Sequence, residues 1–258
     1  AKFRAARRLW ARLLREHFHA GDDACRLRFH TQTGGATLTA QQPLNNVVRV
    51  ALQAMAAVLG GTQSLHTNSY DEALALPTSQ SATLALRTQQ LLAFETGVPD
   101  VPDPLGGSYY VEALTDEMER GARVLLEQVE ALGGSARAIE RGFFQEAIAR
   151  SAYEYQRDVE RGDAVVVGVN RFADGSAAPP VPAPDYAELA AAQRRRLAAT
   201  RTSRDNGAVR AALDALRAAA AAPAAPLMEA IVDAVRARGT VGEISDTLRG
   251  VWGAYQPG

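Results

Sequence analysis

Two consecutive stretches of the chain repeat one pattern of hydrophobic and polar positions. Residues 26–30 alternate apolar and polar side chains and lead into a glycine-rich loop, and residues 45–59 have the apolar spacing of a helix. Residues 63–68 predict a second short strand, and residues 79–94 predict a second helix. Two such strand, loop and helix units predict parallel strands joined by helical crossovers. A doubly wound sheet and a (β/α) barrel both fit, and in both the loops after the strands carry the function.

The rest of the chain is predicted to be mainly helical. An amphipathic helix is expected over residues 2–19, and glycines and prolines separate the later helices. The later helices are expected at residues 112–132, 136–140, 145–160, 186–200, 206–222, 227–238 and 241–255. The β-branched run at 165–170 predicts one buried strand, and four prolines within 177–185 predict an extended connector. We therefore expect an α/β part at 1–105, a helical extension with one strand at 106–176, and a helical segment at 186–258 after the connector.

Composition excludes several classes of protein. The chain of 258 residues is 47% hydrophobic, which is enough to bury a core and argues against disorder. Its 28 Lys and Arg against 29 Asp and Glu offer no global attraction to nucleic acid, and no apolar run is long enough to span a membrane. Cys25 is the single cysteine, so an internal disulfide is impossible and a cytoplasmic setting is expected. The chain begins with Ala1 and not Met, which indicates a fragment.

The two loops after the predicted strands hold the candidate chemistry. Residues 30–39 offer an imidazole, an amide and hydroxyls beside glycines that let the backbone approach a bulky ligand. Residues 66–77 add amides and carboxylates, and a carboxylate such as Glu72 can accept two hydrogen bonds from a ribose diol. Familiar phosphate-binding, zinc-protease and hydrolase motifs are absent. Of the four histidines, His30 and His66 lie near these loops, and without a thiolate partner or a carboxylate cluster they predict no metal site.

Ordinary helix capping is the competing interpretation of these polar residues. Asn68 or Asp71 could cap a helix, and Thr78 or Ser79 could cap the helix at 79–94. From spacing alone this interpretation is the more common use of such side chains.

Several long motifs resemble one family. The strings are KFRAARRLW (2–10), RFHTQTGGATLTAQQPLNN (28–46), GGTQSLHTNSYDEALALPT (60–78), DPLGGSYYVE (103–112), VVVGVNRF (165–172) and TVGEISDTL (240–248). They resemble the large subunit of the adenosylcobalamin-dependent acyl-CoA mutases, the methylmalonyl-CoA mutase family. The resemblance implies the C-terminal portion of a (β/α)8 TIM barrel, with its final two strands, followed by a mostly helical extension that leads toward a cobalamin-binding domain.

The resemblance also implies a site and a reaction. The family isomerises the carbon skeleton of a branched acyl-CoA, of the methylmalonyl-CoA and succinyl-CoA type, by a radical mechanism that needs adenosylcobalamin. The residues that match its cofactor face are Gln32, Gly35, Ala36, Gln63, Asn68, Glu72 and Ala75. The family's substrate-contacting residues lie in earlier barrel strands, and the DxHxxG motif that supplies a histidine to cobalt is absent. No catalytic residue and no metal ligand are therefore expected in this chain.

The implied partners are the acyl-CoA substrate, the remaining barrel strands, a cobalamin-binding domain or small subunit, and further copies in an oligomer. The loop reads HTQTGGAT, where methylmalonyl-specific members usually read close to HSQTSGWS, so the identity of the acyl-CoA stays open. A second hypothesis is a non-catalytic remnant or assembly module that docks a mutase partner. A generic α/β ligand-binding module is a third, and it rests on loop chemistry alone.

Overall fold

The computed structural model describes residues 1–175 and 186–254, which fall into two compact units. The first unit ends at Pro184 and the second begins at Asp185. The proline-rich connector predicted at 177–185 lies outside the described residues. Along the described part of the chain, no helix combines the length and the apolar character needed to cross a membrane.

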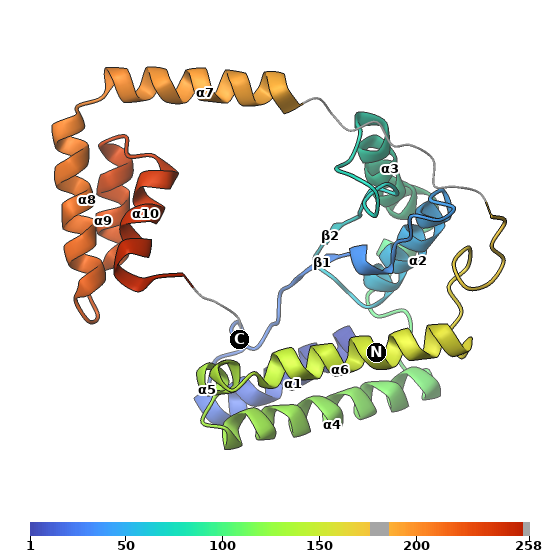
Figure 1. Ribbon diagram of the computed structural model, residues 1–258. Helices are drawn as coiled ribbons and strands as arrows, with labels where there is room; N and C mark the ends of the chain where they lie inside the picture. Colours follow the sequence, from blue (N-terminus) through green and yellow to red (C-terminus); the bar gives the residue numbers. More distant parts are fainter. Residues whose placement is uncertain (176–185, 255–258) are drawn as a thin grey trace. The chain divides into compact units, whose positions relative to one another are not determined.

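A small parallel sheet with two flanking helices forms the α/β part of the first unit (Figure 1). Strand β1 (His30–Gln32) pairs with β2 (Ser64–His66), with Gln32 opposite His66. Helix α2 (Asn45–Leu59) joins the two strands, and α3 (Ser79–Glu95) follows β2. The crossover predicted from the repeat is therefore confirmed, and the chain is α/β with mostly helical content.

Both strands begin or end differently from the sequence prediction. The alternating run at 26–30 predicted a strand that ends where β1 begins, because alternation does not show where a pairing partner is available. The paired residues start only where His30 meets Ser64. One further backbone bond lies at each end, from the Gln63 amide to the Phe29 carbonyl and from the Thr33 amide to the His66 carbonyl. Strand β2 is also shorter than the predicted 63–68.

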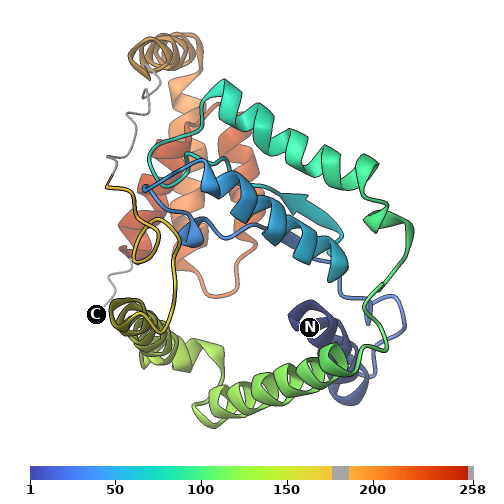
Figure 2. The same cartoon turned by 90° about the vertical axis from the view of Figure 1, so that its right-hand side faces the viewer.

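One face of this sheet is covered and the other is open. Leu65 shares an apolar pocket with Val58 of α2 and Leu86 of α3. Figure 2 shows these two helices lying side by side. The opposite face carries the exposed side chains of His30, Gln32, Ser64 and His66. The sheet therefore has an apolar helix-covered side and a polar side.

Helices α1 (Lys2–Phe18) and α4 (Tyr109–Ala131) pack together through a ladder of ion pairs. Arg4 binds Glu112 at 2.7 Å, and Arg8 and Arg12 both bind the buried Glu119. The arginines recur every four residues and so share one helix face. Hydrogen bonds from Arg4, then from the Gly107 amide, lower the pKa of Glu112 to about 2. Burial alone would raise the pKa of Glu119, but its arginine partners outweigh that effect and lower it.

The segment after α4 holds two helices and a turn in place of the predicted strand. Helices α5 (Ser135–Glu140) and α6 (Phe143–Arg161) follow closely the predicted ranges. The prediction of a buried strand at 165–170 was wrong, because Asn170 turns the chain back: its side chain accepts from the Val166 amide and donates to the Ala164 carbonyl. Val167 makes only an isolated bridge, and its side chain is exposed. A β-branched run without a neighbouring strand cannot complete a ladder.

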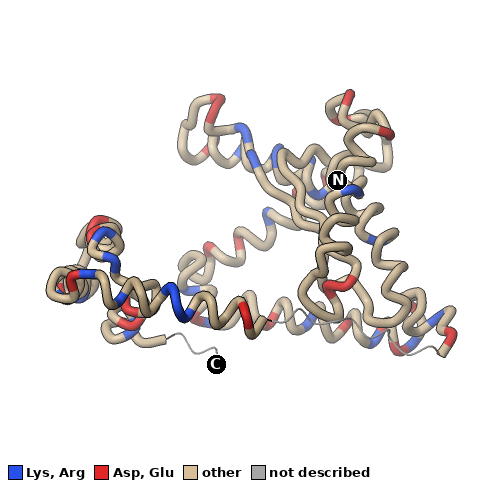
Figure 3. The backbone as a smooth tube through the Cα atoms, turned by 90° about the horizontal axis from the view of Figure 1, so that it is seen from above, with Lys and Arg blue, Asp and Glu red and all other residues tan. Residues whose placement is uncertain are grey.

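The second unit is helical throughout its described part. It contains α7 (Tyr186–Ser203), α8 (Asn206–Ala221), α9 (Leu227–Arg236) and α10 (Val241–Trp252), and α8 packs on both α9 and α10. Leu216 and Ala234 are fully buried between them. Arg204 pairs with Glu243 at 2.6 Å, next to a capping box that Glu243 forms with Thr240. Figure 3 shows acidic and basic residues interspersed along the helices of both units.

Candidate functional site

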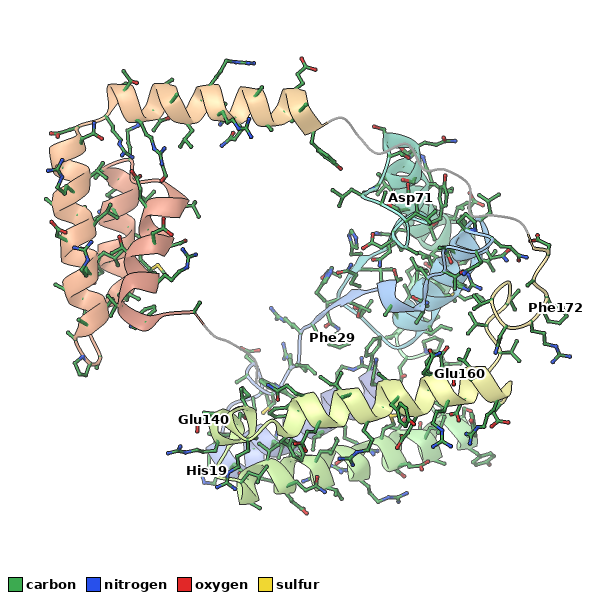
Figure 4. All side chains as sticks on the ribbon, viewed as in Figure 1. His19, Phe29, Asp71, Glu140, Glu160 and Phe172 are labelled. Atoms are coloured by element: carbon green, nitrogen blue, oxygen red, sulfur yellow. The ribbon has the colours of Figure 1, made fainter. Side chains whose placement is uncertain are left out.

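The loops that follow β1 and β2 leave the sheet at the same edge and are bonded to each other there. Thr33, the first residue after β1, is buried, and its hydroxyl accepts a hydrogen bond from the backbone amide of Asn68 at 2.9 Å. Figure 4 shows Asp71 in the second loop, away from Phe29, which precedes β1 at the other end of the strands. Parallel pairing therefore brings residues 33–37 and 67–72 together, as the sequence predicted.

Gln32, Gly35, Asn68 and Glu72 form one cluster at this edge. The Gln32 side-chain amide donates to Oδ1 of Asn68 at 2.9 Å. A Cβ placed on Gly35 would lie 2.9 Å from Nδ2 of Asn68 and 3.7 Å from Cγ of Glu72. Only glycine allows this close approach of the first loop to the two side chains of the second. Four of the seven candidate residues predicted from the sequence therefore lie close to one another through these contacts.

Ala36 and Ala75 lie on the same two loops. Ala36 is exposed and belongs to the single turn of 3₁₀ helix η1 (Gly35–Thr37). Ala75 is half-buried, and its amide donates to the Asp71 carbonyl at 3.0 Å. Both present only a methyl group, so they can shape a wall of the site but cannot supply a polar contact.

Gln63 lies at the opposite end of the sheet from this cluster. Its side-chain oxygen accepts from the Phe29 amide at 2.8 Å, and its nitrogen donates to the Gly61 carbonyl at 2.7 Å. The bond with Phe29 joins the residues that precede the two strands, and the bond with Gly61 is local. The structure does not bring Gln63 together with the other candidate residues.

Helix capping accounts for Thr78 but not for the other polar residues of the second loop. Thr78 is the N-cap of α3, and its hydroxyl accepts from the Ser81 amide. Asn68 and Asp71 are almost fully buried and cap no described helix. Nδ2 of Asn68 and Oδ1 of Asp71 have no hydrogen-bond partner among the residues that the structure describes. Buried polar atoms are normally paired, so an unpaired donor at this edge fits the contact of a polar ligand.

Glu72 supplies the complementary acceptor. Its side chain is exposed, and within residues 1–175 and 186–254 its carboxylate bonds to no other residue. The site therefore offers an exposed carboxylate, a buried amide donor that is unpaired among the described residues, and close-lying backbone, which suit a neutral ligand with hydroxyl groups. No cluster of three His, Cys, Asp or Glu that could hold a metal ion is found in the described part of the chain.

Asn46 is a buried residue of this region that the sequence analysis missed. It lies in the first turn of α2, fully buried, and its side chain contacts both loops through Thr39 and Tyr70. Two adjacent asparagines at the start of a helix are the visible signal, but nothing in the sequence distinguishes Asn46 from Asn45.

Comparisons with known proteins agree with this architecture. The sequence model of the family described as methylmalonyl-CoA mutase matches residues 1–254. The 2-hydroxyisobutanoyl-CoA mutase large subunit of Aquincola tertiaricarbonis is 48% identical over 258 residues, which cover 99% of this chain and 46% of that protein. Methylmalonyl-CoA mutase of Rhizobium meliloti (strain 1021) is 48% identical over 256 residues, covering 99% of this chain and 36% of that protein.

A mammalian protein is similar to the chain over the same residues. Mitochondrial methylmalonyl-CoA mutase of Homo sapiens is 43% identical over 258 residues, which cover 99% of this chain and 34% of that protein. The chain thus spans less than half the length of each of these three relatives. Because the family model and the relatives cover nearly every residue that carries the sheet, the loops and the helices described above, the chain belongs to the methylmalonyl-CoA mutase family.

Proposed function

We propose that this chain is the later part of the large subunit of an adenosylcobalamin-dependent acyl-CoA mutase. In this proposal β1 and β2 are the last two strands of a (β/α)8 barrel, and the helices after α3 form the extension toward a cobalamin-binding domain. The parallel pairing, the helical crossover and a polar strand face support it. The remaining barrel strands and the cobalamin-binding domain or small subunit are partners, and the active assembly is a cytoplasmic oligomer.

The cluster at the strand ends is proposed as the cofactor face. Glu72 accepts hydrogen bonds from the ribose of the adenosyl group, and Nδ2 of Asn68 donates to the same group. Gln32 orients the Asn68 side chain. The small residues Gly35, Ala36 and Ala75 leave space beside the two loops for the bulky ring of the cofactor. When bound, adenosylcobalamin supplies the radical chemistry that isomerises the acyl-CoA carbon skeleton. The chain's own part is to bind and orient the cofactor and to exclude water.

The observation that carries this proposal is the approach of Gly35 to Asn68 and Glu72. A ligand with hydroxyl groups satisfies the unpaired Asn68 amide and the free Glu72 carboxylate together. The substrate in this proposal is a branched acyl-CoA, and the relatives' names, which contain 2-hydroxyisobutanoyl-CoA and methylmalonyl-CoA, support it. Residues that contact the reacting atoms come from the other barrel strands, so none is assigned here. In the alternative of an assembly module, the cluster would bind no cofactor.

Replacing the free carboxylate tests the proposal. Glu72→Gln, in the complete mutase that contains this chain, is expected to weaken adenosylcobalamin binding about tenfold, because a charged acceptor is lost. Binding is followed by the absorbance change of the cofactor, and turnover is measured with a panel of branched acyl-CoA esters. Glu95→Gln, at the exposed end of α3, is the matched control. Unchanged cofactor affinity in Glu72→Gln would favour the assembly module.

A further inference from the structure

Asn46 connects the two loops that carry the candidate site. Its Nδ2 donates to the Thr39 carbonyl at 2.8 Å and to the Tyr70 carbonyl at 2.9 Å. Its Oδ1 accepts from the Thr39 amide at 3.1 Å. Thr39 belongs to the loop after β1, and Tyr70 lies two residues before Glu72 in the loop after β2. One side chain therefore holds backbone from both loops at once.

The burial of Asn46 gives this connection its strength. The residue is 0% exposed, and both hydrogens of its amide are used within the protein. A hydrogen bond shielded from water is stronger than one at the surface, and losing either partner leaves a buried polar group unpaired. The two loops are thus held at a defined separation by a fully satisfied group.

Arg49, which lies one helical turn after Asn46 in α2, fixes the Asn46 side chain by a hydrogen bond. Its guanidinium donates to Oδ1 of Asn46 at 2.7 Å and to the Thr39 hydroxyl at 2.9 Å. The same guanidinium donates to the Val167 carbonyl at 2.8 Å in the turn after α6. The helical extension is thereby attached to the same network.

We propose that Asn46 is a positioning residue, supported by Arg49, that sets the distance between the Gly35 loop and the Glu72 loop. It touches neither the cofactor nor the substrate. It acts by keeping Gly35, Asn68 and Glu72 in mutual reach, so removing it weakens cofactor binding through Glu72 itself. This inference rests on the proposed cofactor role of that cluster.

A double-mutant cycle between Asn46 and Glu72 tests the inference in the complete mutase. Asn46→Ala and Glu72→Gln are each expected to weaken adenosylcobalamin binding about tenfold, and the double variant little more than either alone, since both losses act on one contact. Asn45→Ala is the matched control, because within the described residues the Asn45 side-chain amide bonds only to Gln42, three residues earlier, at 2.9 Å. We expect its affinity to stay within about twofold of the parent.

The outcomes separate this inference from the proposed function. A neutral Glu72→Gln overturns the proposed function, whereas a weakened Glu72→Gln beside a neutral Asn46→Ala overturns only the inference. Additive losses of about a hundredfold in the double variant, or an equal loss in Asn45→Ala, would also overturn it. If Asn46→Ala does not fold, Arg49→Gln replaces it in the cycle, because Arg49 lies nearer the surface. An unchanged affinity in Arg49→Gln then counts against the inference.

Discussion

Gln32, the last residue of β1, donates a hydrogen bond of 2.9 Å to Oδ1 of Asn68, two residues beyond β2. Since the oxygen of the Asn68 side-chain amide is occupied, its nitrogen is the group left over, and that nitrogen is buried with no hydrogen-bond partner in the described part of the chain. The bond thus decides that the nitrogen end of the Asn68 side-chain amide lies toward Gly35.

Gln32→Ala should weaken adenosylcobalamin binding about fivefold, because the Asn68 amide becomes free to rotate. The fold should be little affected, since the Gln32 side chain is exposed. Cofactor titration and thermal unfolding of the complete mutase measure the two effects. Gln63→Ala is the matched comparison. We expect it to lower the thermal midpoint with unchanged affinity, because Gln63 bonds to Phe29 and Gly61 at the opposite end of the sheet. The reverse result would return Gln63 to the cofactor face.

Gly35→Ala tests the close approach of the two loops. The added methyl group would lie 2.9 Å from Nδ2 of Asn68, so the loops must separate. We expect a loss of about 1–2 kcal/mol in the free energy of unfolding, together with weaker cofactor binding. Gly21→Ala is the control, because a Cβ there meets no atom within 4 Å. Equal behaviour of the two variants in denaturant unfolding and cofactor titration would refute the steric role of Gly35.

The α1–α4 ion pairs predict a loss of stability in acid. The pKa of Glu112 falls from 4.5 to about 2 on folding, with Arg4 as the main cause. As the pH falls, Glu112 is therefore protonated in the unfolded chain before it is protonated in the folded one. The stabilisation from its ion pair is complete above the unfolded pKa, and it disappears as the pH falls from about 5 toward about 2. Urea unfolding midpoints at about pH 7 and about pH 3 measure this difference.

Arg4→Met should reduce that pH dependence, because the pKa of Glu112 then returns toward its ordinary value. Arg26→Met removes the same charge from an exposed pair with Asp23 and serves as the control. An identical pH dependence in both variants would show that the Arg4 pair does not contribute.

Glu243→Gln should destabilise the second unit. Arg204, which is 6% exposed, loses its charged partner, and the capping box at Thr240 loses its carboxylate. The hydrogen bond from Arg204 is also the main cause of the lowered pKa of Glu243. We expect a lower thermal midpoint by calorimetry, with Glu229→Gln on α9 as the control. A thermal midpoint equal to that of the control would show that the Arg204–Glu243 ion pair does not contribute to the stability of the second unit.

Local signals in the sequence were enough to place the helices. Helix α2 begins and ends at the predicted residues because apolar spacing fills its length and two glycines follow it. The other helices agree to within a few residues, since helix hydrogen bonds form between neighbours along the chain. Strands differ, because their hydrogen bonds need a distant partner. The run at 165–170 has β-branched side chains but makes only one isolated bridge in the described part of the chain, and Asn170 turns it back.

The sequence by itself determined the parallel α/β repeat, the helices and, through its long motifs, the family and the loops that carry the candidate residues. Only the tertiary structure decided how those residues are grouped. It joined Gln32, Gly35, Asn68 and Glu72, separated Gln63 from them, and revealed Asn46, because hydrogen bonds to backbone atoms 7 and 24 residues away depend on how the loops pack. Such contacts cannot be recognised in the amino-acid sequence, because every residue has a backbone carbonyl that a side-chain amide can bond to.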